Sequence, residues 1–129
     1  MIPKDKQLLI QDLCARLSSG VKVETVQGRY GELVGIYKHD DGSYSFDVKE
    51  ADGITGIAGD VIPKPYLRPM SSMTEEEKKE LNNVLEYQYY SDDSCMCEST
   101  DWLNVRHFDY RGLIEKKLAL EAPDGMYNE

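Results

Sequence analysis

Several features that would identify a membrane, secreted or disulfide-bonded protein are missing from this sequence. No uninterrupted apolar run approaches the ~20 residues that span a bilayer. The N-terminus lacks the apolar region of a secretory signal. The three cysteines are an odd number in a chain without an export signal, which argues against a disulfide framework. These absences predict a cytoplasmic protein with no membrane partner.

Positive charge is also scarce. The 129-residue chain has 15 Lys and Arg against 24 Asp and Glu, a net charge of −9. Residues 1–70 are nearly neutral, with 9 basic and 10 acidic side chains, whereas residues 71–129 have 6 and 14. Phosphate backbones would be repelled by the second half. Duplex DNA is therefore an unfavourable partner, and a basic or strand-presenting protein is a more compatible one.

The chain length and a hydrophobic content of 40% are typical of one globular domain. Within residues 1–129 we expect a helix and a β-rich part over 1–62, a proline-rich connector over 63–73, and a helical part over 74–129. The fold class predicted is therefore α+β.

Helical periodicity marks residues 5–18. Apolar side chains recur every four positions, with two more beside them: Leu9, Leu13, Leu17, Ile10 and Cys14. Cys14 is accordingly predicted to be a small core residue. The other faces hold polar residues: Lys6, Gln7, Asp12 and Arg16. Gly20 suits the left-handed position that ends such a helix.

Alternation with a period of two follows, and it indicates short strands near 21–25, 33–37, 44–48 and 54–57. The turn Asp40-Asp41-Gly42-Ser43 predicts a hairpin. Short strands joined by tight turns favour a small curled antiparallel sheet, either an open meander or an SH3-like barrel. Pro63, Pro65 and Pro69 then predict an extended surface connector that is neither helix nor central strand.

The second half begins with a capping box. Thr74 can cap a helix whose third residue, Glu77, reaches back to it, and the helix should run to about residues 87–90. Residues 91–100 are polar and acidic, so we expect a loop, with helix resuming at Asp101. Asp109 is predicted to cap a further helix. Residues 118–120 fit either helix or strand, and regular structure should end near residues 123–125.

Candidate metal and catalytic residues are few. Cys95 and Cys97 could bind zinc together with His107 or an acidic neighbour, but a single Cys-x-Cys is a weak signal. Reduced thiols in a loop are favoured, and a redox switch is the remaining alternative. His39 fits a surface turn, and His107 fits a structural hydrogen bond. The glycines of residues 53–59 lack the Gly-Lys-Ser/Thr of a phosphate loop. We therefore predict no metal, no cofactor and no catalytic residue.

Aromatic residues offer another candidate. Tyr87, Tyr89 and Tyr90 could form an interaction surface, although half-buried packing is the favoured interpretation at helical spacing. Trp102 and Phe108 are predicted to be core anchors.

Two stretches, residues 64–77 and 101–123, resemble a family of small uncharacterised proteins from phages, prophages and genomes of gut Bacteroidales. The resemblance rests on the strings KPYLRPMSSMTEEE, DWLN, HFDYRGLIEK and LALEAP. It implies a bacterial or phage cytoplasmic setting and no assigned activity. The family often has glycine where this chain has Lys117.

The sequence thus favours a non-enzymatic interaction or accessory protein whose partner is another protein, and the resemblance offers a phage or prophage as one source. The alternatives are a nucleic-acid-associated module that uses the β-rich half, and a hydrolase of unrecognised type. The basic residues available to a nucleic-acid module are dispersed: Lys22, Arg29, Lys38 and Lys49. The sequence leaves the oligomeric state open.

Overall fold

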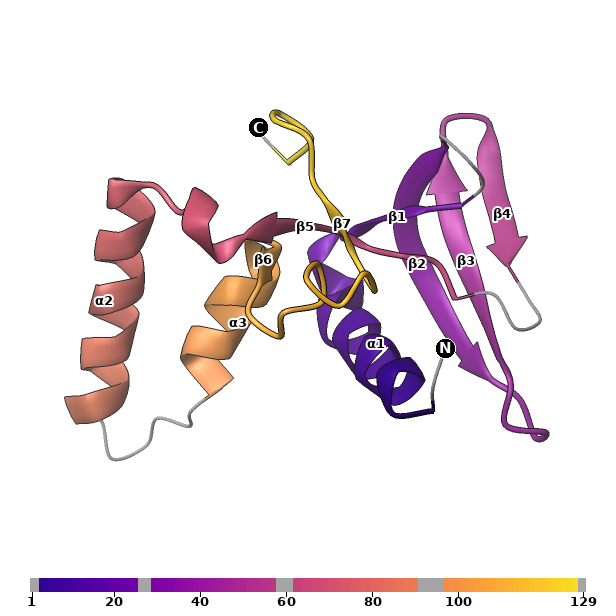
Figure 1. Ribbon diagram of the computed structural model, residues 1–129, viewed down its shortest axis with the longest axis horizontal. Coiled ribbons are helices and arrows are strands. Elements are labelled where there is room, and N and C mark those ends of the chain that lie inside the picture. The colour runs from indigo at the N-terminus through magenta and orange to yellow at the C-terminus, as the bar shows by residue number, and fades with distance from the viewer. Residues whose placement is uncertain (1–2, 26–28, 58–61, 91–96, 128–129) are drawn as a thin grey trace.

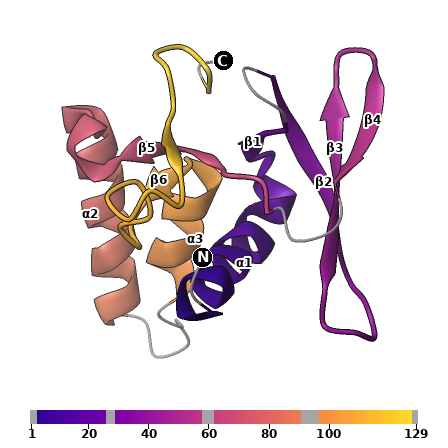
Figure 2. The same cartoon turned by 45° about the vertical axis from the view of Figure 1, so that its right-hand side comes forward.

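The computed structural model describes residues 3–25, 29–57, 62–90 and 97–127, without the side chains of residues 87–90, 97 and 98. Helix α1 lies between a four-stranded antiparallel sheet on one side and helices α2 and α3 on the other (Figures 1 and 2). The α+β prediction is confirmed. None of the described helices combines the length and the apolar character needed to cross a membrane.

Helix α1 spans Pro3–Arg16 and passes into a short 3-10 helix, η1, at Leu17–Ser19. Gly20 follows with φ 71°, the predicted left-handed stop. Leu9 and Leu13 are fully buried and supply α1's part of the core.

The predicted positions of three other α1 residues were wrong. Cys14 is exposed, whereas Asp12 and Arg16 are fully buried. Cys14 lies about 100° around the helix from Leu13, beyond the buried stripe. The two charged residues tolerate burial because they bind each other: Arg16 Nε lies 3.1 and 3.0 Å from the two Asp12 carboxylate oxygens.

Strands β1 (Lys22–Glu24), β2 (Tyr30–Lys38), β3 (Tyr44–Glu50) and β4 (Gly53–Ile57) form the antiparallel sheet in chain order. Gly42, with φ 87°, makes the predicted hairpin turn between β2 and β3. Gly31 is required by a close approach of strands, because a Cβ there would lie 2.5 Å from the Lys49 carbonyl oxygen. The described strands form an open sheet and no closed barrel, so the SH3-like alternative is not confirmed.

The core lies where α1 meets the inner face of this sheet. The side chains that alternate inward on β2 and β3 are buried against α1: Leu33, Phe46 and Val48. Later segments complete the core with Leu67, Leu113, Leu118 and Ala119.

The expectation of a surface connector at the prolines was wrong. β5 (Tyr66–Pro69) is the central strand of a three-stranded parallel sheet, between β6 (Phe108–Asp109) and β7 (Leu120–Glu121). The prolines are tolerated because none of them has to donate. The Pro65 carbonyl accepts from Leu120 N at 2.9 Å, while the donor to His107 O, at 2.7 Å, is Arg68 N. Residues 118–120 were expected to be either helix or strand. Leu120 lies in strand β7, and residues 118–119 form a bend.

The capping box is confirmed. After the short helix η2 (Met70–Ser72), Glu77 N donates to Thr74 Oγ1 at 3.1 Å and Thr74 N donates to Glu77 Oε1 at 3.0 Å. The helix they cap, α2, spans Glu75–Tyr90. Glu77 also holds Arg68 through two contacts of 2.8 Å, and Glu80 binds Arg106 at 2.7 Å. These pairs connect α2 to β5 and to the residue that follows Val105 in the chain.

Two expectations in the last third need correction. Helix α3 spans Cys97–Val105, so it begins inside the segment expected to be a loop. The Asp109 carboxylate does accept from Leu113 N and Ile114 N, at 2.9 and 3.0 Å, but residues 113–117 form turns and no helix. The cap was correctly predicted and its helix was not, because the chain turns back to form β7. No helix or strand follows Glu121 within the described residues.

Candidate functional site

The predicted interaction surface of Tyr87, Tyr89 and Tyr90 falls on the last turn of α2. The side chains of these residues lie outside the described part of the chain, so this surface stays a prediction. The sulfur atoms of Cys95 and Cys97 lie outside it as well. Within the described residues, no three His, Cys, Asp or Glu side chains gather in a group that could hold a metal ion.

The two histidines occupy contrasting places. His39 is exposed beside the β2–β3 turn, as expected, with its Nε2 3.0 Å from Ser45 Oγ. His107 is only 8% exposed and has a left-handed backbone, with φ 64°. Its Nδ1 has no hydrogen-bond partner among the described residues, whereas its backbone carbonyl accepts from Arg68 N at 2.7 Å and its backbone N–H donates to Asn104 O at 3.1 Å.

Tyr127 covers the His107 ring. The two rings stack with centroids 3.8 Å apart, and Tyr127 Oη donates to Tyr66 O at 2.7 Å and accepts from Lys22 N at 2.8 Å. Burial is the largest cause that lowers the pKa of His107, and the nearby cations Arg16, Arg68 and Lys22 add to it, so that the pKa falls to about 4. A neutral, covered imidazole suits the interior of the fold better than acid–base catalysis.

An aromatic stack joins α3 to β6 in the interior of the fold. The Trp102 ring stacks on Phe108 with centroids 5.9 Å apart, while Arg106 lies over Trp102 and Arg68 over Phe108. Phe108 is fully buried, as predicted, and Trp102 is half-buried.

The buried carboxylate of Glu50 on β3 accepts hydrogen bonds from residues near three other strands of the sheet. Glu50 accepts from Thr25 Oγ1 at 2.9 Å, from Arg29 Nη2 at 3.0 Å and from Thr55 Oγ1 at 2.5 Å. The hydrogen bond from Thr55 is the largest cause that lowers the pKa of Glu50. With its oxygens already occupied, this carboxylate ties β4 to the start of β2 and offers no free base.

Two grooves lie along the surface of α1, one on each side of the helix. The first, about 470 Å³, lies between α1 and the β2–β3 hairpin, and the second, about 580 Å³, lies between α1 and the segment near residue 116. Gln7 and Gln11 line both grooves, so they form the ridge between them. Apolar side chains contribute to the first groove, namely Pro3, Ile10 and Tyr44, and Leu8 contributes to the second.

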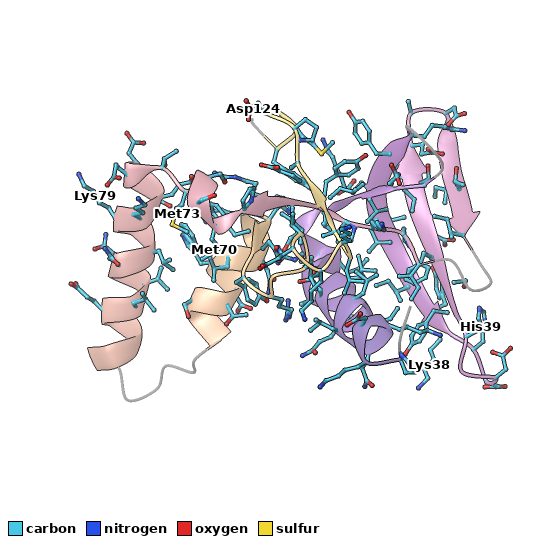
Figure 3. All side chains as sticks on the ribbon, viewed as in Figure 1. Lys38, His39, Met70, Met73, Lys79 and Asp124 are labelled. Atoms are coloured by element: carbon cyan, nitrogen blue, oxygen red, sulfur yellow. The ribbon has the colours of Figure 1, made fainter. Side chains whose placement is uncertain are left out.

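Lysines surround the same ridge. Lys6 and Lys38 line the first groove, and Lys4 and Lys116 line the second. Figure 3 shows Lys38 at the hairpin end of β2, near the N-terminal half of α1. None of the four forms an ion pair with another described residue, and Asp5 is the one carboxylate in either lining. The lining of the two grooves is therefore positively charged, although the net charge of the whole chain is −9.

The basic residues considered for nucleic acid do not gather. Lys22 Nζ is bound to Met126 O at 2.8 Å, and Arg29 pairs with Glu50 and Asp52. Among the aromatics that could stack on bases, Phe46 is fully buried, while about half the surface of Tyr30 and of Tyr37 is exposed. Its interaction with the Asp47 carboxylate raises the pKa of Tyr37.

Sequence reasoning missed the lysine-lined grooves. Lys4 and Lys6 could have been read as a basic start of the first helix, but Lys38 and Lys116 reach it only through the fold. No family model, curated protein or solved structure matches the chain.

Proposed function

We propose that this chain is a non-enzymatic protein-interaction module that binds an acidic amphipathic helix of a partner along α1. The observation that carries the proposal is the pair of lysine-lined grooves on either side of the Gln7–Gln11 ridge. The partner would be another protein, as the sequence suggested, but its contact surface would be acidic.

The shape of the site supports a helical occupant. Gln7 and Gln11 are spaced i, i+4, the spacing of the ridges that pack into grooves between helices. α1 has 14 residues, or about 21 Å of helix. A partner helix of three to four turns would match that length and could cover both grooves.

The chemistry of the site supports an acidic, partly apolar occupant. Ile10, Tyr44 and Leu8 offer apolar contacts in the grooves, while the four lysines are free to pair with carboxylates. Apolar contacts in the centre with charges at the rim are typical of protein interfaces. Nucleic acid would use the lysines but would gain little from the aliphatic floor, which is why a protein is the favoured partner.

The test uses a labelled peptide of about 18 residues, long enough to be helical, with leucine on one face and glutamate on the other. A second peptide with lysine in place of glutamate, and labelled duplex and single-stranded DNA, complete the set. Fluorescence anisotropy at increasing salt should show binding of the glutamate peptide only, and the affinity should decrease as salt screens the charges.

The double variant Lys6→Glu/Lys38→Glu should weaken that binding about tenfold, because two attractive contacts become repulsive. Lys49→Glu/Lys79→Glu makes the same change in net charge at exposed lysines away from α1, and Lys79 lies at the other end of the molecule (Figure 3). Equal weakening by both doubles would refute the proposed site. Submicromolar, salt-sensitive binding of either DNA would instead promote the nucleic-acid alternative.

A further inference from the structure

Strand β4 leaves one edge of the antiparallel sheet open. β4 pairs with β3 on one side, and within the described chain no strand pairs with its other side. Figures 1 and 2 both show β4 as the outermost strand. An open edge presents unpaired N–H and C=O groups that another strand can use.

The composition of β4 gives this edge no protection. Its residues are Gly-Ile-Thr-Gly-Ile, without the lysine, other charge or proline that commonly blocks edge pairing. Ile54 is 67% exposed, the largest value among the exposed large apolar side chains of the described residues. An isoleucine this exposed on an uncharged edge is a candidate for contact with another chain.

The two faces of β4 differ. Ile57 packs against the core, so Gly53 and Thr55 share its inner face, and Ile54 and Gly56 lie on the outer face. The outer face is open at Gly56, because a Cβ there would meet only Asp47 Oδ1, at 3.8 Å. Each face of this short strand therefore carries one isoleucine and one glycine: Ile54 and Gly56 on the outer face, Ile57 and Gly53 on the inner face.

We propose that β4 pairs with β4 of a second copy of this chain, antiparallel and centred on Thr55. In that register Ile54 of each copy lies opposite Gly56 of the other, and Gly53 lies opposite Ile57. Every isoleucine then fills the space beside a glycine, on both faces of the joined sheet. The contact is isologous, so it closes after two copies and joins the two sheets into one of eight strands.

Charge favours this approach over others. The acidic excess belongs to residues 71–129, and α2 and α3 lie at the opposite end of the molecule from β4 (Figure 1). The nearly neutral first 70 residues supply β4 and its neighbours. A five-residue edge contact buries less than the ~1,600 Å² of a standard interface, so we expect a dimer that dissociates in the micromolar range.

Sedimentation velocity from about 1 to 200 µM tests the dimer directly, and the wild-type chain should shift from monomer to dimer over that range. Ile54→Asp should weaken association at least tenfold, since it places an aspartate against the partner's edge. Val34→Asp is the matched control, because Val34 is also exposed, at 43%, but lies on β2, away from the edge. Circular dichroism first establishes that all variants fold.

A rescue variant tests the register. In Ile54→Asp/Gly56→Lys each introduced aspartate faces an introduced lysine of the other copy, and within its own sheet it neighbours Lys49 while the new lysine neighbours Asp47. This double variant should regain the dimer. A wild-type chain that is monomeric at 200 µM, an unaffected Ile54→Asp variant, or a double variant that stays monomeric would each overturn the proposal. None of these results depends on binding at α1.

Discussion

Acidification should destabilise this protein through His107 well before most carboxylates are protonated. Its pKa is about 4 in the fold, because burial and the cations Arg16, Arg68 and Lys22 disfavour the charged ring. The ordinary histidine pKa is about 6.5. Between these values the unfolded chain binds a proton that the folded chain does not, so stability falls as pH falls through that window.

The magnitude follows from the same pair of values. Crossing the whole window lowers the free energy of unfolding by about 3 kcal/mol. Going from pH 7.5 to pH 4.5 lowers it by on the order of 2 kcal/mol. Other groups also titrate in this range, so a variant is needed to isolate the contribution. His107→Asn removes the imidazole and keeps a residue that tolerates the left-handed backbone, here φ 64°.

At pH 7.5 the variant should be less stable than the wild type by about 1–2 kcal/mol, because the stack on Tyr127 is lost. At pH 4.5 the gap should close or reverse, since only the wild type carries the histidine penalty. Urea unfolding at both pH values measures the two differences. His39→Asn, which removes the exposed histidine, is the control. Its free energy of unfolding should change between pH 7.5 and pH 4.5 by as much as that of the wild type. Parallel stability curves for the wild type and His107→Asn would refute the assignment of the acid sensitivity to His107.

Four other predictions follow from local geometry. Glu77 has its pKa lowered to about 2, chiefly by hydrogen bonding to Arg68, so its contribution is complete above pH 4.5 and is lost as pH falls towards 2. After discounting for solvent screening, Glu77→Gln should cost about 1 kcal/mol at pH 7 and less at pH 3 in guanidinium titrations; a cost that does not change with pH would contradict this. Lys117 has φ 62°, which glycine adopts without strain, so Lys117→Gly should raise the free energy of unfolding by about 0.5–1 kcal/mol, and a loss would show that the exposed side chain matters. Asp12→Asn leaves the fully buried Arg16 without its counter-charge and should cost about 3 kcal/mol in thermal unfolding; a variant as stable as the wild type would mean that the pair is dispensable. The chain should show no measurable binding to duplex DNA near physiological salt, because its net charge repels phosphates. Submicromolar binding in a fluorescence anisotropy titration would contradict this prediction.

Local signals were sufficient wherever all the interacting groups lie within a few residues. Thr74 and Glu77 complete their capping box across three positions, and Gly42 makes its turn inside one hairpin. Period-two alternation likewise identified the four strands, because each strand has one face towards the core.

Long-range contacts decided what local pattern could not. Asp12 and Arg16 read as surface residues, yet they are buried because Arg111 and the carbonyl of Phe108, about 90 to 100 residues away in sequence, join their network. The prolines around β5 argued against a central strand. The parallel partners β6 and β7 make one possible, since their hydrogen bonds fall on other backbone groups.

The candidate site shows the same division. The sequence alone determined that the chain is acidic, that it mixes helices with a small sheet, and that Lys6 lies on a polar face of its first helix. Only the tertiary structure brought Lys38 and Lys116 to opposite sides of that helix and left β4 at an open edge. Periodicity reports which face of an element is buried, but it carries no information about which distant segment covers it, and both proposed interaction surfaces depend on that packing.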